Sequence, residues 1–421
     1  MELDMEDMVK ESMNRAVSLA EEAAEYAKKG NEEEAQKVMV EAESALQAAE
    51  NPGEKERAEA YRRFCDVYKM LREYEKALDY AEKNLDLCLK TEGHDHPAAA
   101  DAYRRLGAVY DGMSDFYKAE EAFHEALKII DLTPEENLEL QVSVNRSLAD
   151  TYSRFCVLEP ARNCYQKALK IKEKMSELQD TESVHMLCCL AYAYNYSDKP
   201  EKAMRYLQRA KDIMEQYHDP DDSQMGEVWR TFGVVKYDED NLNEVLRYYQ
   251  KAVKNQEKQI CPNYTTLVES YIGVADTYKG MRKYELALKY FRKGLSKAEK
   301  YMGSNSPEVY SIWILLAILY SNTRDWMKAG RHLEGALRYF EGLFGENNIQ
   351  VGILYDLKSQ IVMFKNASDE GAEMLEKATR IFEKYYGSNS PTVRNNYKSL
   401  DEVFTKLGNK KKAAEYRRKA S

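Results

Sequence analysis

Small and apolar residues recur along this chain at helical spacing, and the same arrangement returns at a fixed interval. Residues 106–126 read Leu-Gly-x-x-Tyr, followed by Ala119, Phe123 and Ala126. Residues 148–168 and 190–210 repeat the arrangement, with small and large side chains at the same places. Because residues three, four and seven apart share one face of a helix, each segment predicts two amphipathic helices joined by a short turn.

The interval between equivalent positions is 42 residues along the whole chain. The small residue near the start of the second helix of each unit marks it, at Ala35, Ala77, Ala119, Ala161, Ala203, Val245, Ala287, Ala329, Gly371 and Ala413. Ten such units account for 420 of the 421 residues, so we expect no second domain of another kind.

Small residues also recur in the first helix of each unit, usually with a tyrosine three positions later. The small positions are Ala23, Cys65, Gly107, Ala149, Ala191, Gly233, Ala275 and Ala317. Small side chains let two antiparallel helices approach closely. A single pair cannot bury both of its faces, so the pairs are expected to stack. The pattern predicts an all-α fold, a solenoid of about ten stacked antiparallel helix pairs.

Residues 1–15 are expected to form a lead-in or cap, and residues 16–421 a single solenoid. Turn or cap residues precede Pro97, Pro307 and Pro391, which mark helix starts. The repeats are expected at approximately 16–51, 58–93, 98–135, 140–178, 182–219, 224–260, 265–302, 307–345, 349–387 and 391–421. In the ninth repeat, Lys358-Ser359 fits the pattern poorly, which predicts a register slip or an insertion there.

Composition narrows the class of partner. Hydrophobic residues make up 44% of the chain, enough for a core, and the 9 Pro and 19 Gly are too dispersed for a disordered linker. The net charge of −10 disfavours nucleic acid and anionic membranes as partners. No apolar run is long enough to span a membrane, and the N-terminal residues do not resemble a signal peptide, so we expect a cytoplasmic or nucleoplasmic protein.

The skeleton of Leu-small-x-x-Tyr followed by Ala, an aromatic residue and Ala resembles the tetratricopeptide repeat family over the full length of the chain. The 42-residue interval, and joints such as Gly-Ser-Asn-Ser-Pro-Glu-Val at residues 303–309, look like the kinesin-light-chain type, without that protein's coiled-coil region. The resemblance implies a right-handed α-solenoid. It also implies that the first helix of each repeat lines a concave groove, which binds peptides of partner proteins.

If residues at the same phase stack along that groove, arginines line its N-terminal half. The position three residues before the small residue holds Arg62, Arg104, Arg146 and Arg230, where the family favours asparagine. One interpretation is a site for an acidic segment or a C-terminal carboxylate, which guanidinium groups bind through paired hydrogen bonds. The other is local ion pairing, since Asp66 and Asp150 each follow an arginine by four residues, whereas Arg104 and Arg230 have no such neighbour.

Other positions expected in the groove are polar or aromatic. These further candidate contacts are Lys69, Tyr192, Asn195, Tyr237 and Lys279. Rigid amphipathic rings serve as anchors at interfaces, so the tyrosines beside Asn195 are candidates to hold an apolar side chain of a partner. The alternative is that they close the packing between repeats.

His185, Cys188 and Cys189 lie together on one predicted helix and raise the question of a metal or a reactive thiol. Adjacent residues point about 100° apart on a helix, and no fourth ligand is in evident reach, so we interpret them as packing residues. The 7 cysteines form neither a disulfide framework nor a CxxC pattern and are expected to be reduced and buried. No phosphate loop, nucleophile elbow or HExxH occurs, so we predict no enzyme activity, no metal and no cofactor.

These features predict a non-catalytic adaptor or scaffold that binds an acidic or extended segment of a protein partner in its groove. Two alternatives remain open. One is a scaffold that holds large folded partners on its outer face and ends. The other is a regulator whose superhelix tightens when a peptide binds.

Overall fold

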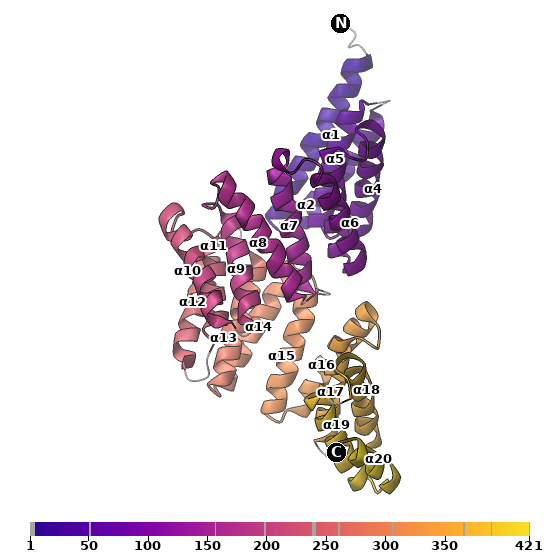
Figure 1. Cartoon of the computed structure of the whole chain (residues 1–421), viewed down its shortest axis with the longest axis vertical. Helices are drawn as coiled ribbons and strands as arrows, with labels where there is room; N and C mark the ends of the chain where they lie inside the picture. Colours follow the sequence, from indigo (N-terminus) through magenta and orange to yellow (C-terminus); the bar gives the residue numbers. More distant parts are fainter. Residues whose placement is uncertain are drawn as a thin grey trace. The chain divides into compact units, whose positions relative to one another are not determined.

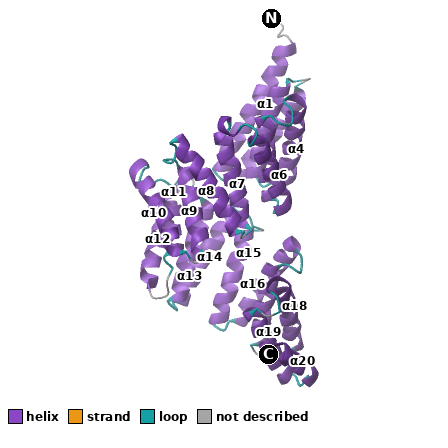
Figure 2. Ribbon diagram, viewed as in Figure 1, coloured by secondary structure: helices purple, strands orange, loops and turns teal. Residues whose placement is uncertain are grey.

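The computed structural model describes residues 5–49, 52–155, 157–197, 199–237, 241–259, 262–304, 306–364, 367–388 and 390–420. Over these residues the chain forms helices joined by short loops and no β-strand (Figure 1, Figure 2). The predicted all-α class is therefore confirmed.

The α-helices are α1 (Met5–Lys28), α2 (Glu32–Ala48), α3 (Glu54–Met70), α4 (Tyr74–Thr91), α5 (Pro97–Gly112), α6 (Phe116–Ile130), α7 (Leu138–Arg154), α8 (Leu158–Met175), α9 (Thr181–Asn195), α10 (Pro200–Tyr217), α11 (Gln224–Val235), α12 (Leu242–Glu257), α13 (Tyr264–Gly280), α14 (Tyr284–Tyr301), α15 (Pro307–Asn322), α16 (Trp326–Phe344), α17 (Ile349–Met363), α18 (Asp369–Tyr386), α19 (Pro391–Lys406) and α20 (Lys410–Ala420). A short 3-10 turn, η1 (Pro134–Glu136), precedes α7.

The chain divides into two compact units. Unit 1 comprises Met1–Lys236 and Lys254–Asn263, and unit 2 comprises Tyr237–Val253 and Tyr264–Ser421. Within each unit the odd-numbered helix of a pair comes first along the chain, and we call it the first helix. In unit 1, α3 packs against its partner α4 and also against α1 and α5. Each first helix therefore lies between its neighbours, which is the stacking that the repeat predicts.

Small residues hold the helices of a pair together. The marker positions of the second helices are buried, and Ala35, Ala77 and Ala119 are fully so. In the first helix α5, a Cβ atom at Gly107 would lie 2.9 Å from the ring of Phe123 on α6. The alternation of small residue and ring is therefore a packing requirement.

The turn within each pair also recurs at the 42-residue interval. One residue of the turn has a left-handed backbone. In the pairs where the structure describes it, this residue is Gly30, Arg72, Ser114, Arg282, Arg324 and Gly408 in turn. Residues with a side chain adopt this conformation at some cost, so the turn is imposed by the packing of the two helices it joins.

The expected helix starts are confirmed, because α5, α15 and α19 begin at Pro97, Pro307 and Pro391. The expected register slip in the ninth repeat is wrong. The first helix α17 begins at Ile349, 42 residues after α15, and Ser359 is fully buried at the position equivalent to Ala317. A hydroxyl replaces the methyl group there and bonds the backbone oxygen of Asp356 at 2.7 Å. At the other end, α1 begins at Met5, so residues 5–15 belong to a first helix.

None of the helices in the described part of the chain combines the length and the apolar character needed to cross a lipid bilayer.

Candidate functional site

The predicted ligand residues lie mainly on the first helices of unit 1. Arg62 and Lys69 belong to α3, Arg104 to α5 and Arg146 to α7. Tyr192 and Asn195 belong to the last turn of α9, and Arg230 to α11. We call the half-buried and exposed side chains of α3, α5, α7, α9 and α11 the first-helix surface of unit 1. Tyr237 and Lys279 belong to unit 2, so they are described separately.

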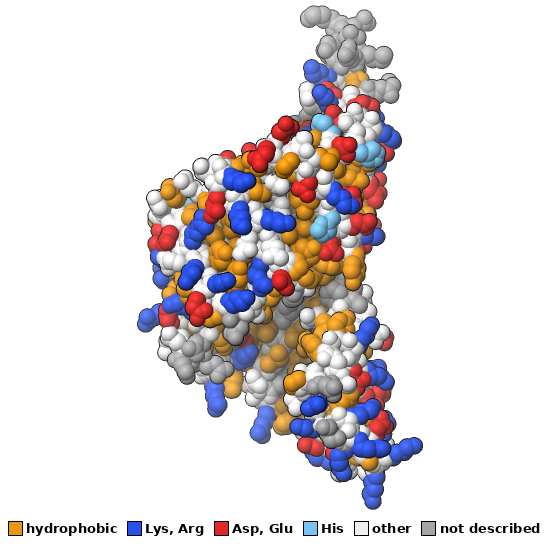
Figure 3. Space-filling model, in the orientation of Figure 1, with side chains coloured by type: hydrophobic (Ala, Val, Ile, Leu, Met, Phe, Trp, Pro, Cys, Tyr) orange, Lys and Arg blue, Asp and Glu red, His pale blue; other side chains and the backbone are white. Residues whose placement is uncertain are grey.

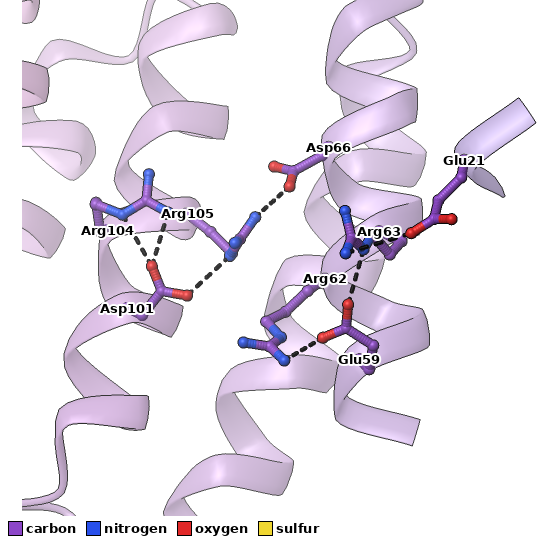
Figure 4. A network of polar contacts seen from close by, with 8 residues as sticks. All are labelled: Glu21, Glu59, Arg62, Arg63, Asp66, Asp101, Arg104 and Arg105. Atoms are coloured by element: carbon purple, nitrogen blue, oxygen red, sulfur yellow. Dashed lines mark hydrogen bonds and ion pairs between the residues drawn. The ribbon is translucent and has the colours of Figure 1, made fainter. Parts of the chain in front are cut away.

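Arg104 has an ion-pair partner, although its sequence neighbours predict that it has none. Its guanidinium donates two hydrogen bonds to Asp101 Oδ1, at 2.9 and 2.7 Å (Figure 4). Asp101 also accepts from Arg105 at 3.1 Å, and Arg105 reaches across to Asp66 on α3. The prediction that Arg104 is unpaired considered only the position four residues after each arginine. Its partner, Asp101, instead precedes Arg104 by three residues.

Arg62 pairs with Glu59, one turn earlier on α3, and the predicted Arg62–Asp66 pair is wrong. Asp66 is occupied by Arg105 of the next first helix. Together with Arg63 and Glu21, the groups in Figure 4 comprise four guanidiniums and four carboxylates. The arginines of α3 and α5 therefore belong to a neutral network and do not form a bare basic stripe. On the face that Figure 3 shows, both basic and acidic side chains lie on the surface, with apolar side chains between them.

Burial and charge oppose one another at Asp101. Burial raises the pKa of this carboxyl group, but Arg104 and Arg105 outweigh burial and hold the pKa below its usual range. Asp101 and both arginines are at most 22% exposed. The network is thus more than a set of solvated surface pairs.

The predicted pair between Arg146 and Asp150 is confirmed, with Arg146 Nη1 3.2 Å from Asp150 Oδ2. Arg146 also reaches the neighbouring first helix α9, where its Nε lies 2.8 Å from Glu182. Arg230 has a polar interaction, and its charge helps to lower the pKa of Glu227. Each arginine of the predicted row therefore has an acidic neighbour.

Two predicted ligand residues keep their polar groups available. Lys69 on α3 has no carboxylate within 4.0 Å among the described residues, and the Asn195 amide on α9 has no hydrogen-bond partner among them. A third donor is Arg62 Nε, which is buried without a hydrogen-bond partner in the part of unit 1 that the structure describes. Arg57 Nε and the Tyr68 hydroxyl, also on α3, are likewise buried without a hydrogen-bond partner among the described residues.

The tyrosines at the end of α9 contact each other. The rings of Tyr192 and Tyr196 have their centroids 4.8 Å apart, and Tyr196 is 65% exposed. Tyr192 and Tyr196 are four residues apart, so they project from the same side of the helix as His185 and Cys189. The exposed ring of Tyr196 and the half-buried ring of Tyr192 thus lie at the end of α9 that also carries Asn195. In unit 2, Lys279 forms an ion pair with Asp276, and Tyr237 is 41% exposed.

His185 and Cys189, interpreted from the sequence as packing residues, lie in a polar cluster. His185 Nε2 is 3.6 Å from Asp150 Oδ1 on α7 and 3.6 Å from Cys189 Sγ, and His185 Nδ1 is 2.8 Å from Glu227 on α11. Asp150, which the sequence pattern did not suggest, lies beside His185 and Cys189, and these three residues form the group without Cys188. For the contact with Glu227 a signal was present, because His185 and Glu227 are 42 residues apart and so occupy equivalent positions of adjacent repeats.

Acidic neighbours govern the protonation of this cluster. The strongest influence on His185 is its electrostatic interaction with Cys189, which together with Glu227 raises the pKa of the imidazole well above its ordinary value, against the effect of burial. Burial raises the pKa of Glu227, but His185 outweighs burial and the pKa stays below the usual range. Tyr165 donates a hydrogen bond of 2.6 Å to Asp150 Oδ1.

The other described cysteines behave as predicted. Cys65, Cys88, Cys164 and Cys188 are free thiols and buried, and burial raises the pKa of Cys65 to about 12. Such thiols stay protonated and unreactive. Cys189 differs, since it is only half buried. Cys156 and Cys261 lie outside the described residues.

Comparison with known proteins identifies the repeats. A tetratricopeptide repeat model matches residues 56–130 and 182–258, and a second model with the same description matches residues 267–308. No curated protein sequence matches the chain.

Several solved structures share the fold at low sequence identity. The apo form of RapI has a TM-score of 0.53 and 16% identity, over 68% of this chain and 98% of that one. The Rap protein complexed with Competence and Sporulation Factor has a TM-score of 0.52 and 15% identity, over 94% and 99%. A tetratricopeptide repeat protein from Parabacteroides merdae has a TM-score of 0.51 and 14% identity, over 73% and 98%. Residues 56–130, 182–258 and 267–308 are therefore tetratricopeptide repeats, and repeats of this kind support a role in protein–protein interaction.

Proposed function

We propose that this chain is a non-catalytic adaptor that binds an extended, acidic segment of a protein partner on the first-helix surface of unit 1. The observation that carries the proposal is the set of unsatisfied donors on that surface. Arg62 Nε and the Lys69 ammonium lie on α3, and the Asn195 amide lies on α9.

The chemistry of these donors selects the ligand. Arg62 and Lys69 are seven residues apart, so two helical turns separate them on one side of α3. Both are cations. Arg62 Nε itself is buried, but the Arg62 side chain as a whole is 40% exposed and Lys69 is half buried. Carboxylates are the acceptors that such groups bind most strongly.

The ion-pair network supports the same proposal through geometry. Asp101 and Asp66 hold Arg105, and Glu59 holds Arg62, before any partner arrives. Side chains that are already ordered lose less entropy on binding, so a fixed surface binds more tightly than a mobile one. Because the network is neutral, it adds no net attraction for an acidic ligand. Only the few donors without a partner attract carboxylates, which favours a short acidic segment over a polyanion.

An aromatic contact is expected to accompany the polar ones. Tyr192 and Tyr196 offer an exposed ring pair next to Asn195, which suits an apolar side chain of the bound segment. The solved Rap protein of the same fold was determined in complex with Competence and Sporulation Factor, so the fold accommodates a ligand.

Selection from random peptides tests the proposal whatever protein the partner is. A random peptide library is displayed on phage and selected on the immobilised chain at low salt, and the affinity of enriched peptides is measured by fluorescence anisotropy. We expect enriched peptides to carry more Asp and Glu than the library. We expect Lys69→Glu to weaken their binding at least about tenfold, since an attractive contact becomes a repulsive one.

A matched control reverses a charge on a second helix. Lys128 on α6 is exposed and pairs only with Glu125, so Lys128→Glu should leave peptide binding unchanged. Selected peptides that bind Lys69→Glu as tightly as the unaltered chain, or a selection without acidic enrichment, would refute the proposed site.

A further inference from the structure

Three side chains on α7 and α9 occupy positions that form an ion pair elsewhere in unit 1. Asp150, His185 and Cys189 each lie 84 residues, or two repeats, after Asp66, Asp101 and Arg105. In the earlier repeats the Arg105 guanidinium lies between the two carboxylates. In the later repeats a thiol replaces that arginine and an imidazole replaces Asp101, while Asp150 keeps its carboxylate.

The replacement removes the cation from the centre of the group. Asp150 Oδ2 is bonded to Arg146, whereas Oδ1 accepts from Tyr165 and faces His185 and Cys189. The ligand atoms Asp150 Oδ1, His185 Nε2 and Cys189 Sγ thus converge on a space that a guanidinium fills two repeats earlier.

The separations of these atoms fit a tetrahedral metal ion. His185 Nε2 lies 3.6 Å from Asp150 Oδ1 and 3.6 Å from Cys189 Sγ, and all three ligand atoms lie within 4.8 Å of one another. Bonds of the usual length to tetrahedral zinc place nitrogen and oxygen ligands about 3.4 Å apart, and nitrogen and sulfur ligands about 3.6 Å apart. Both separations from His185 Nε2 are thus within about 0.2 Å of these values, whereas Asp150 Oδ1 and Cys189 Sγ lie within 4.8 Å of each other and would draw closer around an ion.

Glu227 prepares the imidazole for this role. Its Oε1 lies 2.8 Å from His185 Nδ1, and the residue is only 7% exposed, so the carboxylate is held in place. Metal-binding histidines commonly donate their second N–H to a carboxylate, which fixes the ring and the tautomer. With the proton on Nδ1, the lone pair of Nε2 faces Asp150 and Cys189.

We propose that Asp150, His185 and Cys189 bind a zinc ion through Oδ1, Nε2 and Sγ. One thiolate, one imidazole and one carboxylate form a donor set that suits Zn²⁺. All three residues are half buried, so the ion can enter from solvent. Three protein ligands leave a fourth position for water or for a side chain of a partner. The site stands apart from the proposed peptide binding, because it uses none of the unsatisfied donors of α3 and α9.

Cobalt provides a direct test in the full chain. Co²⁺ is titrated into the reduced, metal-free protein at neutral pH, in a reductant that does not bind metals. We expect the visible bands of tetrahedral cobalt and a near-ultraviolet thiolate-to-cobalt band, both saturating at one equivalent and both lost when Zn²⁺ is added. Zn²⁺ should also raise the melting temperature of the unaltered chain, because it binds the folded state.

Variants assign the bands to these residues. Cys189→Ser should abolish the thiolate band, and Asp150→Asn should weaken cobalt binding. Glu227→Gln should weaken it about 10–100-fold, as expected for a residue that orients a ligand without touching the metal. The matched control is Cys188→Ala, which removes the adjacent, buried thiol and should leave the spectrum unchanged.

Circular dichroism of each variant verifies its fold. The titration of the unaltered chain does not depend on any variant. Absence of the bands and of the melting shift in that chain would overturn the site and leave His185 as an imidazolium between two carboxylates. A thiolate band that survives in Cys189→Ser would overturn it as well.

Discussion

At the scale of single residues, close contact between glycine and an aromatic ring sets the spacing of helices, both within a pair and between neighbouring pairs. Gly107 on α5 faces Phe123 on α6, and Gly273 on α13 faces Tyr249 on α12. A Cβ atom at Gly273 would lie 2.3 Å from Tyr249 Cε1, well inside van der Waals contact. The ring is 7% exposed and has little room to move.

Gly273→Ala should therefore destabilise the protein by about 1–3 kcal/mol, because overpacking outweighs the better helix propensity of alanine. The control is Gly330→Ala in α16, where a Cβ atom would meet nothing within 4 Å. That substitution should stabilise the protein by about 0.5–1 kcal/mol. Denaturant unfolding of both variants measures the effect. If both variants change the free energy of unfolding equally and in the same direction, helix propensity, and not contact with the ring, determines stability at these positions.

At the scale of helices, carboxylates tie neighbouring first helices together. Asp66 of α3 accepts from Arg105 of α5, whose other side is held by Asp101. Glu182 of α9 forms an ion pair with Arg146 of α7. These contacts bridge 36 to 39 residues of sequence, so they tie together successive repeats and not successive turns.

Asp101→Asn should lower the free energy of unfolding at pH 7 by about 1–3 kcal/mol, because it leaves Arg104 and Arg105 without their partly buried counter-charge. The folded-state pKa of Asp101 lies below its unfolded value of about 3.9, so its charge stabilises the fold above that pH. The difference from the unaltered chain should shrink as the pH falls below about 3.9. Urea unfolding at several pH values measures it.

Asp79→Asn is the matched control for Asp101→Asn. Asp79 pairs with Lys83 at 2.6 Å on α4, but both side chains are about half exposed. This substitution should cost no more than about 1 kcal/mol at any pH. If Asp79→Asn lowers the free energy of unfolding as much as Asp101→Asn does, the network of Figure 4 stabilises the fold no more than a surface ion pair.

At the scale of the whole molecule, stability is local because the main contacts of each pair, among the described residues, are with the pairs beside it. The last pair, α19 and α20, packs on one side only, through a cluster of Leu375, Leu400 and Phe404 with smaller neighbours. An end pair with one neighbour has fewer contacts to lose before it opens.

Leu400→Ala should cost about 2–5 kcal/mol locally, since Leu400 is fully buried. Amide hydrogen exchange should accelerate in α18, α19 and α20 and remain unchanged in α3 to α9. Leu187→Ala in α9 is the counterpart, with pairs on both sides, and should accelerate exchange in α7 to α11. Uniform acceleration over the chain in either variant would contradict independent stacking.

The sequence by itself determined the helix pairs, their 42-residue interval and most helix starts. These follow from contacts between residues close along the chain, such as the small positions and the prolines at helix starts. It also indicated the helices that carry the candidate ligand-binding residues. Even in the ninth repeat, where Ser359 obscures the pattern, the interval itself was the better guide, because backbone packing holds the phase when one side chain departs from the consensus.

Only the tertiary structure decided which of those ligand-binding candidates already have a partner within the chain. Arg104 looked unpaired and Lys69 looked ordinary, yet Arg104 is held by Asp101 while Lys69 has no ion pair among the described residues. His185 looked like a packing residue until α7 and α11 brought Asp150 and Glu227 to it. Charges pair according to distance in space, and neighbouring repeats place residues about 40 positions apart within a few ångströms of each other, where helical periodicity alone cannot choose a partner.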